Sequence, residues 1–168
     1  MPENKQSGFR NWMLRASTLR MLMNLWPPFL GAGISVERIA PDFSSARIRM
    51  KLRWYNRNYV GTHYGGSLFS MTDAFFAILV IHQLGKEYVV WDKYSSIDYL
   101  APGKGVVTAD FVLPDGFVAE VLKRTADGSK YEPILTTTIY DTQGVAIAAV
   151  EKKLHIRKAR PKNAVSSL

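Results

Sequence analysis

The sequence predicts an α+β domain in which one curled antiparallel sheet of about six strands wraps around a long, buried central helix. Residues 66–83 are apolar on nearly every side of a helix, so such a helix must be buried all round. Four strand-like runs follow it, at 88–99, 106–114, 134–141 and 145–156. Short turns join the later runs, which favours antiparallel pairing and a sheet that covers the helix.

The elements before the central helix complete this order. In residues 9–26 apolar positions recur at three- and four-residue steps, which predicts an extra amphipathic N-terminal helix. A Trp-Pro-Pro-Phe motif at 26–29 ends it, because proline lacks the amide donor that a helix needs. This helix packs on the domain, forms a lid over an apolar substrate or lies on a membrane surface. Strands are expected at 33–40 and 44–52, and 115–125 is a short helix or an irregular link.

The 168 residues fit one domain of ordinary size. We expect that domain at 9–158, with a disordered segment at 1–8 and a basic, flexible tail at 159–168. No run of 18 or more apolar residues and no signal-peptide core is present, so we expect no membrane span and a cytoplasmic protein.

The composition excludes several kinds of site. There are no cysteines, which rules out disulfides, thiolate nucleophiles and cysteine-ligated zinc. The three histidines are widely spaced and show no metal-ligand pattern, so no metal is expected.

The net charge of +8 is concentrated in two places, 47–53 and 152–162. In 47–53 four cations alternate with three apolar residues, which on a strand puts all the cations on one face. That face either attracts an anion, such as nucleic acid or the phosphates of a nucleotide-bearing substrate, or is the solvated side of a half-buried strand.

Asp73 is the one charge within the central helix. An unpaired carboxylate is costly among apolar side chains, so this position predicts either a functional group or a structural hydrogen bond. Just before the helix, Gly65 and Gly66 allow close approach of a backbone or a ligand. The free amides of a first helical turn can hold an oxyanion, although such glycines can also serve only a tight turn.

The segment from Asn58 through His63-Tyr64-Gly65-Gly66 to Asp73 resembles the Asn … His-Gly-Gly … Asp signature of hotdog-fold thioesterases of the phenylacetyl-CoA type. The stretch 97–105 is similar to that family's strand after the central helix. The resemblance covers about 31–157, and the N-terminal helix with its Trp-Pro-Pro-Phe end resembles a little-characterised bacterial branch. One position departs from the signature, because Tyr64 stands where the family has histidine and His63 lies one step earlier.

The resemblance implies an acyl-CoA thioesterase. Asp73 would act as general base on water or as nucleophile on the thioester carbonyl. The amides of Gly65 and Gly66 would form the oxyanion hole, and Asn58 would orient the water or the thioester. The remaining candidates are auxiliary or bind the substrate: His63, Tyr64, Ser95 and Ser96 as auxiliary groups, and Arg57 or the 152–160 segment at the CoA phosphates.

The resemblance also implies a homodimer or a dimer of dimers, with each site at the subunit interface. Coenzyme A enters as part of the substrate, no further cofactor is needed, and no nucleic acid is expected. Two alternatives stay open. One is a non-catalytic acyl-CoA-binding or regulatory hotdog domain, and the other is a hydroxyacyl dehydratase, which needs a histidine facing an acid.

Overall fold

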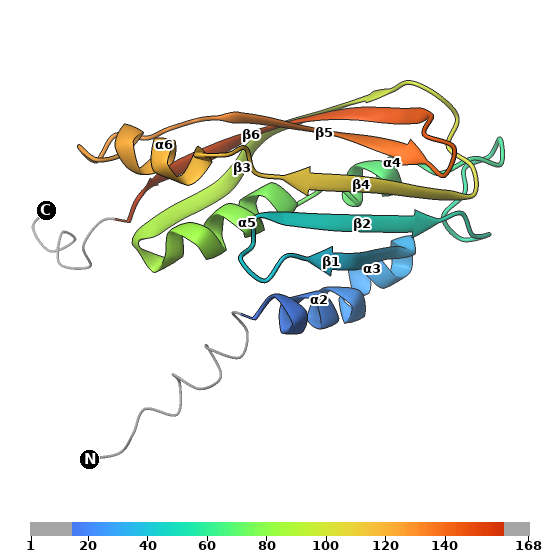
Figure 1. Cartoon of the computed structure of the whole chain (residues 1–168). Helices are drawn as coiled ribbons and strands as arrows, with labels where there is room; N and C mark the ends of the chain where they lie inside the picture. The colour runs from blue at the N-terminus through green and yellow to red at the C-terminus, as the bar shows by residue number, and fades with distance from the viewer. Residues whose placement is uncertain (1–14, 160–168) are drawn as a thin grey trace, which may run out of the picture.

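The computed structural model describes residues 15–159 and contains a six-stranded antiparallel sheet in the order β1-β2-β4-β5-β6-β3. Figure 1 shows the sheet curling around the central helical segment, with β1 and β3 at its two edges. The strands are β1 (Ile34–Ile39), β2 (Ser45–Lys51), β3 (Tyr88–Tyr99), β4 (Val106–Val112), β5 (Ile134–Asp141) and β6 (Ala146–Lys158). The predicted α+β class and the curled sheet are confirmed.

The helices flank and fill this sheet. They are α2 (Ala16–Leu25), α3 (Pro27–Ala32), α4 (Gly65–Ser70), α5 (Phe75–Leu84), the 3₁₀ turn η1 (Gly85–Glu87) and α6 (Phe117–Arg124). The predicted N-terminal helix is present as α2, which runs along edge strand β1 (Figure 1) and ends before extended Trp26. The ambiguous stretch at 115–125 is a short helix, α6. The segment predicted at 1–8, the helix start at 9–14 and almost all of the tail predicted at 159–168 lie outside the described residues.

The central helical segment is interrupted, which the periodicity did not predict. Residues 71–74 form a turn between α4 and α5, and Ala74 has a positive φ of 69°. Thr72 contributes to the break because its hydroxyl donates a hydrogen bond of 2.8 Å to the Phe69 carbonyl oxygen, competing with the helical pattern. The interruption matters because Asp73 lies in it.

The stretch Gly65–Glu87 is long and apolar enough to cross a membrane, with a mean hydropathy of 1.5. It contains no unbroken run of 18 apolar residues, because Ser70, Thr72 and Asp73 interrupt it, so it reaches this value only as an average. In the fold this stretch is the core segment that packs against the inner face of the sheet (Figure 1). Its composition therefore reflects burial within the domain, and it gives no indication of a membrane span.

An aromatic cluster joins the helices to the sheet. The ring centroid of Phe111 on β4 lies 5.1 Å from that of Phe75 and 5.0 Å from that of Phe76, both on α5. Phe29 of α3 lies 5.9 Å from Phe75, and all four side chains are at most 2% exposed. The Trp-Pro-Pro-Phe motif thus contributes directly to the core, and it fixes the turn between the N-terminal helices over α5.

The cationic stripe on β2 faces outward, as the alternation predicted. Ile48 and Met50 are fully buried, whereas Arg47 donates hydrogen bonds to Asp110 on β4 and Arg49 pairs with Glu37 on β1 at 3.5 Å. These partners are carboxylates of neighbouring strands. The stripe therefore has the character of a solvated, ion-paired strand face.

Candidate active site

Asp73 lies in the turn between α4 and α5, and its side chain is 63% exposed in the single chain. The expectation of a carboxylate buried within a helix was therefore wrong, because the helix breaks there and turns the side chain outward. The carboxylate has one strong partner: its Oδ1 lies 3.2 Å from Nζ of Lys152, which donates a hydrogen bond to it. Asp73 is thus held by a cation on one oxygen while most of the side chain faces solvent.

Lys152 was not singled out by the sequence analysis, which grouped it with a basic segment expected at the CoA phosphates. That assignment was wrong for this residue, because Lys152 lies on β6 and its side chain is only 1% exposed. Its ammonium also donates a hydrogen bond of 3.0 Å to Oδ2 of Asp92 on β3. The sequence pattern could have shown this, because Lys152 alternates with Leu154 and Ile156. Both of these are buried, and the alternation places all three side chains on the inner face of the sheet.

A small pocket opens beside Asp73. Its volume is about 230 Å³, and apart from Asp73 and Ser70 its walls are apolar: Trp26, Pro28, Phe29 and Phe69. We call it the Trp26 pocket. The Trp-Pro-Pro-Phe motif and the end of α4 supply these walls, so the exposed carboxylate stands at the edge of an apolar, largely aromatic hollow.

Gly65 and Gly66 begin α4, and tyrosine rings pack tightly against both. A β-carbon on Gly65 would lie 2.9 Å from the hydroxyl oxygen of Tyr99, and one on Gly66 would overlap the ring of Tyr64. The Tyr99 hydroxyl also donates a hydrogen bond of 2.9 Å to the Gly65 carbonyl oxygen, and partial desolvation of that hydroxyl raises the pKa of Tyr99, although the residue as a whole is exposed. The two glycine amides belong to a first helical turn that offers them no partner within the helix.

Gly65 lines a different hollow from Asp73. This loop groove has a volume of about 420 Å³, and its walls include Asn58, His63, Gly65, Leu68 and Tyr99. Asp73 lines the Trp26 pocket at the other end of α4. A single chain therefore presents the predicted carboxylate and the predicted oxyanion donors in two separate places.

The Asn58 side chain is engaged within its own loop. Its Nδ2 donates to the Thr62 hydroxyl at 2.9 Å and to the His63 carbonyl oxygen at 3.3 Å. Its Oδ1 accepts hydrogen bonds from the amides of Val60 and Thr62. These bonds fix the shape of the loop before α4, and the structure thus gives Asn58 a positioning task for the backbone that leads to Gly65.

His63 is 2% exposed and joins two loops. Its amide donates to the Gly103 carbonyl oxygen at 2.9 Å, and its Nε2 lies 3.2 Å from the Gly105 carbonyl oxygen. Burial lowers the pKa of the His63 ring below its ordinary value of 6.5. The ring lines the loop groove, whereas Asp73 lines the Trp26 pocket, so the two do not face each other.

We predict that the free energy of unfolding falls as the pH drops below about 6.5. In that range the unfolded chain binds a proton at His63 that the folded chain does not, so this stability is present above pH 6.5 and lost on acidification. Urea unfolding at several pH values measures the free energy of unfolding of the wild type and of His63→Gln, whose side chain does not titrate. Glu132 titrates far below this window, because Lys93 and His155 lower its pKa to about 2. An equal slope in His63→Gln would contradict the assignment.

The remaining predicted residues divide by position. In the register of β3 with β6, Ser95 stands opposite Lys152 and Ser96 opposite Glu151. Ser95 therefore shares the inner face with Lys152, and Ser96 lies on the outer face, away from Asp73. Arg57 is exposed on the loop before α4, where its backbone pairs with that of His63.

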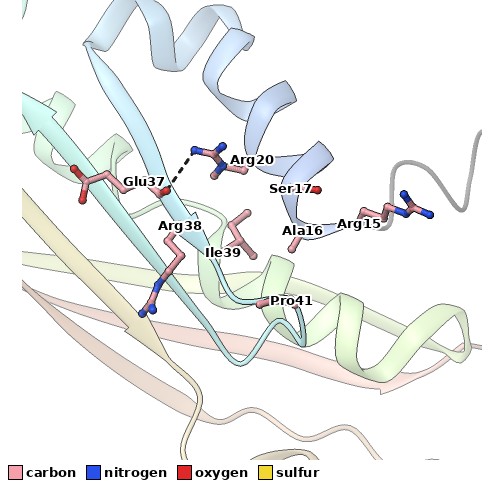
Figure 2. A pocket seen from close by; sticks show the side chains of 8 residues that line it. All are labelled: Arg15, Ala16, Ser17, Arg20, Glu37, Arg38, Ile39 and Pro41. Atoms are coloured by element: carbon pink, nitrogen blue, oxygen red, sulfur yellow. Dashed lines mark hydrogen bonds between the residues drawn. The ribbon is translucent and has the colours of Figure 1, made fainter.

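A third hollow lies between α2 and β1, with a volume of about 360 Å³. Figure 2 shows three arginines at its rim, Arg15, Arg20 and Arg38, whose guanidinium groups point in different directions. Arg20 is hydrogen bonded to the Glu37 carbonyl oxygen at 3.4 Å (Figure 2). Since the cations do not converge, this hollow is not built to hold one anion.

Comparison with solved structures identifies the fold class. The chain is 18% identical to Pseudomonas aeruginosa PA5026, described as a protein of unknown function and probable thioesterase, with a TM-score of 0.73 over 95% of this chain and 99% of that one. The thioesterase HI1161 from Haemophilus influenzae is 12% identical, with a TM-score of 0.64 over 88% and 94%. The PaaI protein of the Escherichia coli phenylacetic acid degradation operon is 18% identical, with a TM-score of 0.57 over 84% and 91%. The hotdog fold is thereby confirmed.

The family follows from the sequence itself. The chain belongs to the family described as "Domain of unknown function (DUF4442)", whose model matches residues 15–156. A search of curated proteins finds no match. The hotdog fold implied by the resemblance at Gly65-Gly66 and Asp73 agrees with these structural neighbours.

Proposed function

We propose that this protein hydrolyses acyl-CoA thioesters, with Asp73 as the reacting carboxylate. One observation carries this most: Asp73 is exposed at the edge of an apolar pocket while a buried lysine holds one of its oxygens. A carboxylate fixed in that way beside an apolar hollow suits attack at an acyl group seated in the hollow. The thioesterases among the structural neighbours support the same reaction class.

Chemically, the free oxygen of Asp73 takes a proton from water as that water adds to the thioester carbonyl carbon, or it attacks that carbon itself. In either route the carbonyl oxygen gains negative charge, which backbone amides can stabilise. Collapse of this intermediate breaks the carbon–sulfur bond, and coenzyme A leaves as a thiolate that is protonated by Asp73 in the first route and by solvent in the second. In the second route water then hydrolyses the acyl–Asp73 anhydride, which releases the carboxylic acid and restores the Asp73 carboxylate. The amides of Gly65 and Gly66 are the proposed donors. Because α4 has only six residues, local hydrogen bonds rather than a long helix dipole would provide this stabilisation.

A second copy of the chain is part of this proposal. Asp73 and Gly65 line separate hollows of one chain, so a site that uses both needs the carboxylate of one subunit and the amides of another. Edge strand β3 is 12 residues long and pairs only with β6 among the described strands. Its exposed aromatic residues Trp91, Tyr94 and Tyr99 suit a covered edge, since a long open edge otherwise invites aggregation.

The coenzyme A part of the substrate is proposed to lie along the loop groove. Arg57 is exposed on the same loop and offers a cation for a phosphate. The reaction would take place in the cytoplasm, where acyl-CoA is made and used, and needs no further cofactor.

Acyl-CoA binding without hydrolysis is a second candidate, and one observation favours it. The Tyr64 ring packs on Gly66, next to the amides proposed for the oxyanion. A ring that stays there on binding would weaken the oxyanion hole. The dehydratase alternative has less support, because the His63 ring is turned toward the Gly105 carbonyl oxygen and lines the groove away from Asp73.

The test is a panel of acyl-CoAs that vary in chain length and aromaticity, with an enoyl-CoA and an acyl-carrier-protein thioester included. Free thiol measures hydrolysis, and the cysteine-free chain adds no background. Hydration of the enoyl-CoA is followed by absorbance, and binding by calorimetry. Hydrolysis of part of the panel supports the proposal, whereas binding without thiol release moves the non-catalytic alternative ahead.

Trp26→Ala is expected to raise KM for the preferred acyl-CoA by about tenfold, with a smaller change in kcat. Trp26 is 46% exposed and forms a wall of the Trp26 pocket, so its loss removes apolar contact with the acyl group in ground and transition states alike. Trp54→Ala is the matched control, since Trp54 is 80% exposed on the loop before α4. Equal KM values for Trp26→Ala and the wild type would place the acyl group elsewhere.

A further inference from the structure

Asp73, Lys152 and Asp92, three charged groups from separate parts of the chain, meet beside the turn between α4 and α5. Nζ of Lys152 on β6 lies 3.2 Å from Oδ1 of Asp73 and 3.0 Å from Oδ2 of Asp92 on β3. The same ammonium is 5.2 Å from the centroid of the Phe69 ring, within the range of a cation–π contact. Two carboxylates and one aromatic face thus enclose the ammonium, and the Lys152 side chain is 1% exposed.

Stability alone does not explain this lysine. The inward positions on either side of it on β6, Val150, Leu154 and Ile156, are buried and apolar, and Lys152 interrupts that row. Burying an ion pair costs much of what the pairing gains, and apolar replacements of similar volume are often as stable or more so. A lysine at this position therefore indicates a use for its charge, and its charge is directed at the most exposed carboxylate of the cluster.

Two backbone irregularities bring the carboxylates to the lysine. The register of β3 with β6 shifts between Asp92 and Tyr94, so Lys93 is the extra residue of a bulge. In a regular strand Asp92 and Ser95 would face opposite sides, but the bulge puts both on the inner face with Lys152. On the helix side, Ala74 adopts a positive φ directly after Asp73. A strained non-glycine residue and a bulge recur at functional sites.

We propose that Lys152 is the positioning residue for Asp73, and that Asp92 is the counter-ion that holds Lys152 in place. The ammonium binds Oδ1 of Asp73 and fixes the carboxylate plane, so that Oδ2 is presented to the acyl group at the Trp26 pocket. Asp92 accepts a hydrogen bond from a second N–H of the ammonium, which keeps the ammonium from rotating away from Asp73. This role rests on the proposed function, because it assumes that Asp73 acts on the thioester.

Lys152→Met tests the role in kinetics. We expect kcat on the preferred acyl-CoA to fall about 100-fold with little change in KM, since a misplaced reacting group costs rate rather than binding. Lys152→Met leaves the half-buried Asp92 without its cation and is expected to lower the Tm. The double variant Lys152→Met/Asp92→Leu removes that unpaired charge and is expected to recover most of the Tm, while kcat stays low. Lys153→Met is the control, because Lys153 is the next residue on β6 and faces the other side of the sheet.

The outcomes separate a positioning role from a structural one. A double variant that recovers both Tm and kcat would overturn the proposal, as would an unchanged kcat in Lys152→Met. Crystal structures of the wild type and the double variant give a readout that needs no activity. We expect one ordered Asp73 conformer on Nζ in the wild type and a displaced or multiple carboxylate in the variant. If the wild type hydrolyses no thioester, the proposed function fails, and an unmoved Asp73 in the variant would separately overturn the positioning role.

Discussion

Asp73→Asn is expected to lower kcat for thioester hydrolysis by about 10²–10⁴-fold, the range found when a positioned acid or base is lost. Asparagine keeps the size of the side chain, and its Oδ1 can still accept a hydrogen bond from Lys152. It cannot take a proton from water and is no nucleophile. The variant thus removes the chemistry of the carboxylate while it preserves the turn between α4 and α5.

Asp98→Asn is the matched control for this variant. Asp98 is an exposed carboxylate on β3, opposite Ala149 of β6 and on the outer face of the sheet. The Asp98→Asn variant loses the same charge as Asp73→Asn, and Asp98 does not line the Trp26 pocket. Initial rates at saturating acyl-CoA, with circular dichroism to verify the fold, give the comparison. An Asp73→Asn protein with the rate of the Asp98→Asn protein would mean that another group acts on the thioester.

Phe111→Ala is expected to lower the free energy of unfolding by about 3–5 kcal/mol, the usual cost of deleting a buried phenylalanine. Phe111 is fully buried, and its ring contacts those of Phe75 and Phe76 from the sheet side. Its loss leaves a cavity between β4 and α5 that two aromatic rings can refill only in part. The effect is large because this cluster joins the sheet to the helix it wraps.

Urea unfolding followed by tryptophan fluorescence measures this loss. Val112→Ala is the control, since Val112 is the next residue on β4, is 60% exposed and faces the other side of the sheet. For that control we expect a change within about 0.5 kcal/mol. A similar small change in Phe111→Ala would contradict the packing described for the core.

Local patterns were sufficient to predict the fold. In the strand at 145–156 the buried residues Val150, Leu154 and Ile156 alternate with Glu151, Lys153 and His155, and the stretch at 66–83 has no polar face, so each pattern indicates burial from nearby residues alone. The predicted strand limits agree with the structure to within two residues, apart from the register shifts. The Trp-Pro-Pro-Phe motif ended the first helix where expected, because proline acts on its immediate neighbours.

The site depended on contacts that local patterns do not contain. Lys152 and Asp73 are 79 positions apart, and nothing near either residue indicates the other. The bulge at Lys93 shifts the alternation of β3 by one residue, so that Ser95, and not Ser96, shares the inner face with Asp92. The break at Ala74 was missed because alanine favours a helix and only tertiary contacts hold it at a positive φ. The residue type and the motif therefore identified Asp73, but the sequence did not reveal which side chains surround it.

The most direct measurement is the amount of coenzyme A that the wild-type protein releases from its preferred acyl-CoA, followed as free thiol until the substrate is consumed. A thioester hydrolase releases many equivalents of coenzyme A per chain, with a rate that saturates in substrate and falls to background in Asp73→Asn. Release that stops at or below one equivalent, or that continues unchanged without the Asp73 carboxylate, would contradict thioester hydrolysis at this site.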